Sequence, residues 1–203
     1  MSKIGLYFGT FNPIHVGHLI IANHMADYTE LDKVWLVVTP QNPFKEKNSL
    51  LADFHRLSLV KVAIEDNHRL SASSIEFDLP KPSYTSNTLA YLNEKYPEHD
   101  FSLIMGEDNL RTFHKWKNHD HIISNHKLYV YPRVLTESEI EELKDFHLNS
   151  PLLNHPNVIM CDAPVMKVSS SFIRNAIKEK KDVRYLLTDV VHDYIKEMHF
   201  YEK

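Results

Sequence analysis

Hydrophobic residues in this chain gather in short uninterrupted runs, separated by longer segments in which they recur at helical spacing. The runs KIGLYF at 3–8, VWLVVTP at 34–40 and FSLIM at 101–105 contain almost no polar residues. Runs without polar alternation are typical of strands that are covered on both faces of a parallel sheet. The longer segments between the runs, such as 15–30, predict amphipathic helices.

Strands and helices alternate over the whole length, which predicts a parallel, doubly wound α/β sheet with helices on both faces. The pattern predicts strands at 3–8, 34–40, 69–77, 101–105, 127–131 and 157–161, and helices at 15–30, after Asp53 as N-cap, and at 84–96, 136–148, 169–179 and 188–200. No repeat or linker divides the chain, so we expect one domain over 1–203, with a helical C-terminal portion from about residue 169. In such folds ligands bind at the carboxyl ends of the strands.

Composition narrows the classes of partner. The chain has 203 residues, 43% of them hydrophobic, and a formal net charge of -4 from 23 basic and 27 acidic residues. We therefore expect small-molecule partners rather than nucleic acid or an anionic membrane. Cys161 is the single cysteine, which excludes an internal disulfide framework, and no run approaches the roughly 20 apolar residues of a membrane span. We expect a cytoplasmic protein, monomer or homodimer.

The segment GTFNPIHVGH, residues 9–18, directly follows the first predicted strand. Gly9 allows a sharp turn there and lets a ligand approach the backbone N–H groups of Thr10 and Phe11. The next helix is predicted to begin near His15, and a helix N-terminus attracts anions through its free N–H groups and its positive dipole end. His15 and His18 are three residues apart and share one face of that turn, where two imidazoles can donate hydrogen bonds to a phosphate chain.

Gly17, between the two histidines, is expected to keep that face open to a bulky ligand. Two other interpretations stay open. The histidines can lie at a helix start without binding a ligand, or they can share a zinc ion, although the motif contains no acidic or cysteine ligand to complete such a site.

A second candidate anion site lies in MKVSSSFIRNAI, residues 166–177. Ser169, Ser170 and Ser171 offer hydroxyl and N–H groups at a predicted helix start, and Arg174 lies within its first turn. The alternative is that the serines only cap the helix.

These motifs carry a family resemblance. GTFNPIHVGH resembles the T-x-H-x-G-H class of nucleotidyltransferases, and KVSSSFIR resembles the I-S-S-T-x-I-R motif of the same superfamily. PSYTSNTL at 82–89 and LIMGEDNL followed by Trp116 resemble segments of the nicotinate-mononucleotide adenylyltransferases. The chain departs from the family pattern at Phe8 and Asn12, in a shorter loop at 41–47, and in YPRV where Arg-Pro-Gly is common.

The resemblance implies a Rossmann-like sheet and transfer of an adenylyl group from ATP to nicotinate mononucleotide, giving deamido-NAD and pyrophosphate. Mg²⁺ is expected to enter with ATP, held mainly by phosphates and water. The implied catalytic residues are His15, His18 and Arg174. The residues implied to bind ATP are Gly9, Thr10, Phe11, Gly106, Asp108, Ser169, Ser170, Ser171 and Ile173.

The acceptor is expected to contact Lys45, Tyr84, Thr85, Trp116 and Lys117. Trp116 offers a flat face on which a nicotinate ring can stack, although both aromatic residues can instead belong to the core. Thr85 begins a predicted helix, whose positive end favours a carboxylate over a neutral amide.

Some assignments stay open at this point. Lys47, Arg56 and Arg133 are further candidates whose side-chain directions the sequence does not give. Alternative activities are transfer to nicotinamide mononucleotide or to phosphopantetheine, or nucleotide sensing without chemistry.

Overall fold

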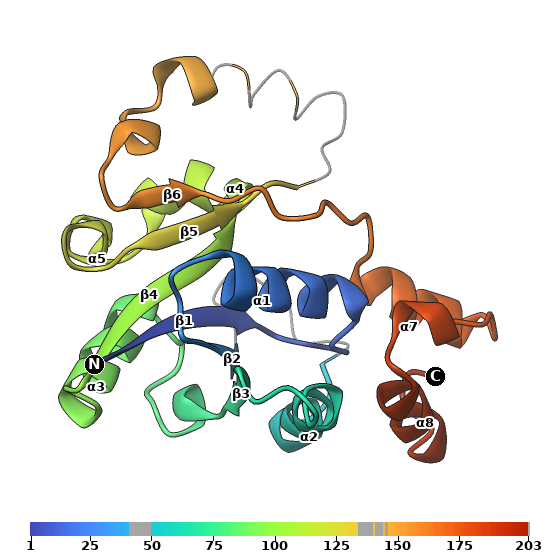
Figure 1. Ribbon diagram of the computed structural model, residues 1–203. Coiled ribbons are helices and arrows are strands. Elements are labelled where there is room, and N and C mark those ends of the chain that lie inside the picture. The colour runs from blue at the N-terminus through green and yellow to red at the C-terminus, as the bar shows by residue number, and fades with distance from the viewer. Residues whose placement is uncertain (41–49, 134–139, 141–143, 145, 203) are drawn as a thin grey trace.

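The computed structural model describes residues 1–40, 50–133, 140, 144 and 146–202. Its centre is a six-stranded sheet in the order β3-β2-β1-β4-β5-β6, with every neighbouring pair parallel (Figure 1). The strands are β1 (Ser2–Gly9), β2 (Lys33–Val38), β3 (Leu70–Ser73), β4 (His99–Gly106), β5 (Leu128–Tyr131) and β6 (Val158–Met160). The predicted doubly wound parallel sheet is confirmed, and its strand order is the Rossmann order.

Both faces of this sheet are covered by helices, as the uninterrupted apolar runs predict. On one face the core contains residues of α1 (Val16–Tyr28), α2 (Asp53–Ala63), α7 (Ser170–Lys178) and α8 (Asp189–Glu197). On the other it contains residues of α3 (Thr85–Lys95), α4 (Glu107–Arg111) and α5 (His119–Asn125). Successive strand residues alternate between the two cores, so that Leu6 packs on one side and Tyr7 on the other.

The winding of the sheet reverses between β1 and β4. Both strands pair directly along their length, with Tyr7 opposite Ile104, and their connections leave toward opposite edges of the sheet. The crevice outside the carboxyl ends of two such strands is where doubly wound folds bind ligands. In this chain, Gly9 and Gly106 end these two strands.

Several predicted elements differ from the structure. Asp53 is the first residue of α2 and not its N-cap, because its carboxylate pairs with Arg56 at 2.6 Å, and Ala52 occupies the cap position. The strand predicted at 69–77 ends at Ser73, and a short 3₁₀ helix, Ile75–Phe77, follows it. The short helices α4 and α5 were not predicted. Most of the helix predicted at 136–148 lies outside the described residues, although 146–149 are helical.

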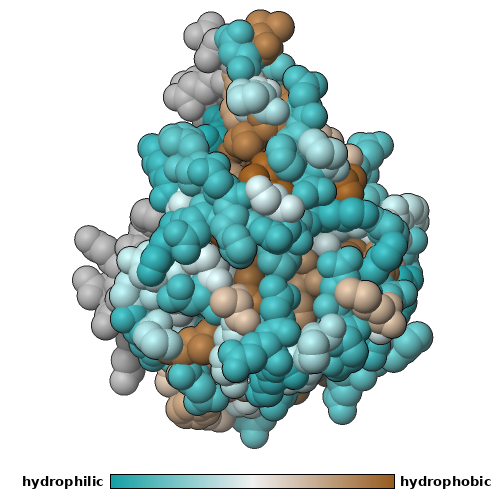
Figure 2. Space-filling view, turned by 90° about the vertical axis from the view of Figure 1, so that its left-hand side faces the viewer, coloured by the Kyte–Doolittle hydropathy of each residue, from teal (hydrophilic) through white to brown (hydrophobic). Residues whose placement is uncertain are grey.

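None of the helices in the described parts of the chain is long and apolar enough to cross a membrane. The face on which the strands begin, with α3 and α5, carries mostly hydrophilic residues (Figure 2).

Candidate active site

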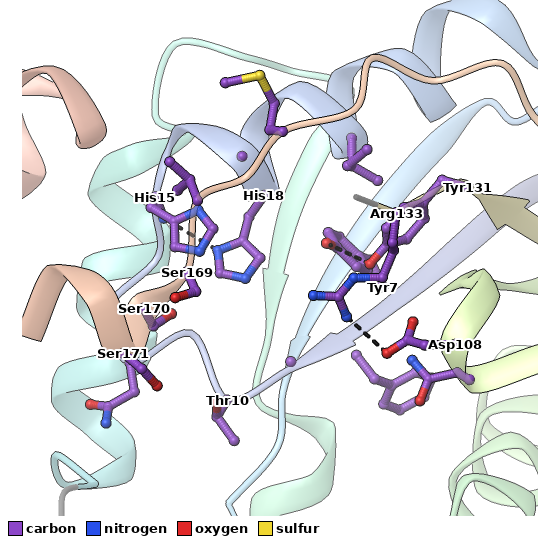
Figure 3. A pocket seen from close by; sticks show the side chains of 18 of the residues that line it. Tyr7, Thr10, His15, His18, Asp108, Tyr131, Arg133, Ser169, Ser170 and Ser171 are labelled. Carbon is purple, nitrogen blue, oxygen red and sulfur yellow. Dashed lines mark hydrogen bonds and ion pairs between the residues drawn. The ribbon is translucent and has the colours of Figure 1, made fainter. Parts of the chain in front are cut away.

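A cavity of about 480 Å³ lies at the crevice between the ends of β1 and β4 (Figure 3). Its lining comes from Tyr7 to Thr10 at the end of β1, the first turn of α1, Asp108 and Asn109 after β4, 131–133 at the end of β5, and residues before and within α7. The volume is within the range of ordinary ligand pockets. The two motifs predicted to bind phosphate therefore line one cavity.

His15 and His18 lie at the start of α1 and line this cavity. Their rings are stacked, with centroids 3.7 Å apart and an interplanar angle of 22°. The backbone N–H of His15 donates to Nδ1 of His18 at 3.3 Å, so the proton of a neutral His18 ring sits on Nε2. Burial lowers the pKa of His15 to about 4, which leaves this ring uncharged at neutral pH.

Gly9, at the end of β1, and Gly17, in the first turn of α1, make room for neighbouring protein side chains. A Cβ on Gly9 would lie 2.8 Å from Cζ of Phe11, and a Cβ on Gly17 would lie 3.1 Å from Nδ1 of His15. All four glycines lie among the described residues, and none of them has a positive φ; Phe11 has one instead, at 45°. The expectation that Gly9 provides a sharp turn is wrong in this respect, because Gly9 ends β1 in extended backbone and the left-handed residue is Phe11.

Arg56 forms hydrogen bonds to the loops that follow β1 and β2. Its side chain is completely buried. Burial disfavours the charged form of the guanidinium and so lowers the pKa of Arg56. The guanidinium donates to the carbonyls of Leu51 at 3.0 Å, Thr10 at 2.6 Å and Thr39 at 2.9 Å, and to Oδ1 of Asp53 at 2.6 Å. Arg56 therefore supports the cavity wall without lining the cavity.

The start of α7 is bonded to the first loop. Arg174 donates to the Asn12 carbonyl at 2.8 Å and to Oγ of Ser171 at 3.2 Å, and Ser170 donates to the Pro13 carbonyl at 2.8 Å. Oγ of Ser169 accepts from the N–H of Phe172 at 3.2 Å and caps the helix. Capping thus accounts for Ser169, while Ser170 joins α7 to the first loop and Ser171 accepts from Arg174 within the same helix.

On the opposite wall, Asp108 and Arg133 form an ion pair at 2.8 Å (Figure 3). Both side chains lie close to Gly106. A Cβ on Gly106 would lie 2.5 Å from Oδ1 of Asp108 and 3.0 Å from Cδ of Arg133. A side chain at the end of β4 would therefore displace one or both members of this pair. Beside it, the hydroxyls of Tyr7 and Tyr131 lie 3.3 Å apart.

Among the residues expected to contact the acceptor, Trp116 lies next to the main cavity. Trp116 lines a small cavity of about 60 Å³, which shares Tyr7 and Tyr131 with the main one. Nζ of Lys117 lies 4.8 Å from the ring centroid of Tyr84, a cation–π contact. Thr85 is the first residue of α3. These residues come together at one place, although Tyr84, Thr85 and Lys117 do not line the main cavity itself.

Comparison with known proteins identifies the family. A family model described as cytidylyltransferase-like matches residues 6–176. A Flavobacterium johnsoniae protein named "Probable nicotinate-nucleotide adenylyltransferase" is 56% identical over 201 residues, which cover 99% of this chain and 100% of that protein. This chain belongs to the nicotinate-nucleotide adenylyltransferase family. A Bacteroides fragilis member with the same name is 43% identical over 194 residues, which cover 96% of this chain and 91% of that protein.

Solved structures agree with the fold of this family. The Plasmodium falciparum nicotinic acid mononucleotide adenylyltransferase complexed with NaAD superposes with a TM-score of 0.77 at 18% identity, covering 100% of this chain and 98% of that one. The same enzyme complexed with APC gives 0.76 at 17% identity, covering 100% and 98%. At such identities the likeness concerns the fold alone.

Nine of the predicted site residues line the main cavity: Gly9, Thr10, His15, His18, Asp108, Ser169, Ser170, Ser171 and Arg174. Gly106 lines the small cavity together with Trp116, whereas Tyr84, Thr85 and Lys117 line neither. The side chains of Phe11 and Ile173 are buried in the core, so only their backbones can face a ligand. Lys45, together with Lys47, lies outside the described residues. The sequence did not assign Tyr7 and Tyr131 to the site, although both line the cavity. The only sequence signal for them was their position near the ends of predicted strands.

Proposed function

We propose that this protein transfers the adenylyl group of ATP to nicotinate mononucleotide in NAD biosynthesis. A phosphate oxygen of the mononucleotide attacks the α-phosphorus of ATP and forms the new P–O bond. The bond from the α-phosphorus to the oxygen bridging to the β-phosphorus breaks, and pyrophosphate leaves with that electron pair. The products are deamido-NAD and pyrophosphate, and no protein nucleophile takes part.

One observation carries the phosphate chemistry. Ser170 and Arg174 bond to Pro13 and Asn12, which are 157 and 162 residues away in sequence, so the two phosphate motifs act on one cavity. Catalysis by such a cavity consists of positioning the reacting groups and stabilising charge in the transition state.

The geometry supports a role for each side chain. Nε2–H of His18 is a donor for the triphosphate, and the stacked, uncharged His15 holds that ring in place. Arg174 has five N–H donors, of which two serve the bonds to Asn12 and Ser171, and we assign the others to the leaving pyrophosphate. Gly106 and Asp108 are proposed to meet the ATP ribose.

The acceptor is assigned to the neighbouring group of Tyr84, Thr85, Trp116 and Lys117. Trp116 and the Tyr84–Lys117 contact supply aromatic surface and positive charge beside the cavity that contains the histidines. The N-terminus of α3 at Thr85 favours a carboxylate over a neutral amide, which would make nicotinate preferred to nicotinamide.

We assign Mg²⁺ to the substrate, as the ion that accompanies ATP. The described residues contain no group of three or more His, Cys, Asp or Glu side chains arranged to hold a metal ion. Magnesium commonly keeps several waters and binds through substrate phosphates. The chain's own contribution is then to hold the triphosphate through the histidines, the serines and Arg174.

The proposal includes one nucleotidyltransferase unit over residues 1–203, in which the helical portion from about residue 169 closes the ATP site. It also includes a cytoplasmic monomer or homodimer. Size-exclusion chromatography with light scattering distinguishes the two states of assembly.

Measurement of pyrophosphate release tests the reaction. The protein is incubated with ATP, Mg²⁺ and, separately, nicotinate mononucleotide, nicotinamide mononucleotide and phosphopantetheine. We expect release with nicotinate mononucleotide and much slower release with the other two. Equal efficiency with the nicotinamide compound would contradict the acid preference, and binding of ATP without release for any acceptor would favour a nucleotide sensor.

A further inference from the structure

Glu76 is a buried carboxyl group that the proposed reaction does not use. It belongs to the 3₁₀ helix Ile75–Phe77 that follows β3, and only 2% of the residue is exposed. Its Oε1 accepts a hydrogen bond of 2.8 Å from the hydroxyl of Thr88. Burial raises the pKa of Glu76, and the hydroxyls of Thr88, Thr39 and Ser83 oppose that rise.

The hydroxyls that surround Glu76 belong to the walls of both substrate sites. Thr39 follows β2 and lines the cavity assigned to ATP. Ser83 directly precedes Tyr84, and Thr88 lies in the first turns of α3, whose N-terminus is assigned to the acceptor carboxylate. Glu76 therefore lies between the ATP cavity and the acceptor site, without lining the ATP cavity.

The hydroxyl of Thr88 faces two acceptors at once. It lies 2.8 Å from Oε1 of Glu76 and 3.4 Å from the carbonyl oxygen of Tyr84. That carbonyl also accepts the backbone N–H groups of Asn87 at 2.9 Å and Thr88 at 3.2 Å, the first bonds of the helix. A hydroxyl has one proton to donate, and the shorter bond directs it to Glu76.

Removal of either partner would release the first turn of α3 from its bond to Glu76. Removal of the Glu76 carboxyl alone would in addition turn this hydroxyl toward the Tyr84 carbonyl. A hydroxyl bonded to the carbonyl four residues earlier competes with the backbone and bends a helix. The bend would fall in the turn whose N–H groups are assigned to the acceptor carboxylate. It would also affect Ser86, the second residue of α3, whose buried hydroxyl oxygen has no hydrogen-bond partner in the part of the chain that the structure describes.

We propose that Glu76 is a positioning residue for the acceptor site: through Thr88 it fixes the first turn of α3 and so sets the preference for an acidic over an amide pyridine ring. The inference rests on the proposed function. Glu76 touches neither substrate in this account, and its effect reaches the acceptor through Thr88 and Tyr84.

Steady-state kinetics of four variants tests this role. Glu76→Ala and Thr88→Val remove one partner each, whereas Glu76→Gln and Thr88→Ser keep an acceptor or a hydroxyl in its place. His126→Ala is the matched control, because it removes a buried hydrogen bond of 2.7 Å to the Phe101 carbonyl, near the opposite end of the sheet. KM and kcat are measured for nicotinate mononucleotide, nicotinamide mononucleotide and ATP, and thermal unfolding is followed for each variant.

We expect Glu76→Ala and Thr88→Val to raise KM for nicotinate mononucleotide about tenfold, since small misplacements of binding groups have effects of this size or larger. The ratio of kcat/KM for the acid to that for the amide falls by a similar factor. KM for ATP and kcat stay within about twofold, as for His126→Ala, because the lost interaction is in acceptor binding. Glu76→Gln and Thr88→Ser stay near wild type.

Two results would overturn the role of Glu76 while leaving the proposed function intact. One is an unchanged acid-to-amide ratio in folded Glu76→Ala and Thr88→Val. The other is an equal loss with both acceptors that His126→Ala reproduces, which would make Glu76 a residue of general stability. If Glu76→Ala fails to fold, the comparison of Thr88→Val with Thr88→Ser decides alone. If the wild-type protein shows no turnover with nicotinate mononucleotide, the proposed function fails and the role of Glu76 with it.

Discussion

Replacement of Arg56 by alanine tests whether a buried arginine supports the phosphate loop. The side chain is completely buried, and its removal leaves three backbone carbonyls, those of Thr10, Thr39 and Leu51, without their charged donor. A buried acceptor left without its donor costs about 1–3 kcal/mol, so three such carbonyls cost at least about 3 kcal/mol. The ion pair with Asp53 contributes little to the unfolding free energy, because a third of the Asp53 side chain is exposed to water.

We therefore expect Arg56→Ala to lose about 4 kcal/mol of unfolding free energy, measured by urea denaturation. A protein of this size loses roughly 2–4 °C in Tm per kcal/mol, so Tm would fall by about 8–16 °C. Arg69→Ala is the control: Arg69 also donates to a carboxylate, Asp27 at 2.6 Å, and to a carbonyl, Leu31 at 2.7 Å, but a third of its side chain is exposed. Its loss should be about 1 kcal/mol. Equal losses in the two variants would refute the argument that burial of Arg56 makes its bonds strong.

Three further predictions follow from the site. His18→Ala should lower kcat about 10²- to 10³-fold with little loss of stability. Its control is His24→Ala, which should leave kcat near wild type, because His24 lies on the same helix but stacks on Tyr28 outside the cavity. Near-normal turnover of His18→Ala would exclude the role assigned to His18. Gly106→Ala should raise KM for ATP about tenfold, because a Cβ 2.5 Å from Asp108 would displace that carboxylate; an unchanged KM would show that ATP does not use it. The pKa of His15 is lowered from 6.5 to about 4 in the folded protein, so between these pH values the unfolded chain binds a proton that the folded one does not. The stability that is present above pH 6.5 is therefore lost as pH falls toward 4. Between pH 7 and 5 we expect a loss of about 2 kcal/mol in unfolding free energy, and a smaller loss in His15→Asn, as measured by urea denaturation at both pH values.

Patterns that are local in sequence predicted much of this fold and the place of its site. The apolar runs at 3–8 and 101–105 became β1 and β4, extended by one or two residues at their ends. Parallel strands bring their carboxyl ends to one edge of the sheet, so the polar segments that follow these runs had to meet there. The same reasoning placed Asp108 near the histidines, and both line the cavity.

Contacts between residues distant in sequence were not predictable in this way. The bond from Arg56 to Thr10 joins residues 46 positions apart, and nothing in the letters around Arg56 distinguishes a buried arginine from a solvated one. The sequence indicated that Gly9 matters, but not the reason, which is that the ring of Phe11 packs where a Cβ would lie. The direction of that ring depends on the left-handed backbone conformation of Phe11. Asp53 had the sequence of an N-cap and pairs with Arg56 because that cation needs a carboxylate nearby.

The bonds at Asn12 and Pro13 also bear on how the site forms during folding. Asn12 accepts from Arg174 and, at its side-chain oxygen, from the hydroxyl of Tyr201 at 2.8 Å, while Pro13 accepts from Ser170. These partners are 157–189 residues apart, among the longest separations that the chain allows. Contacts of such separation are slow to form because a long loop must close first. A chain still being synthesised has its first phosphate motif early, yet it cannot complete the nucleotide site until its last helices have been made.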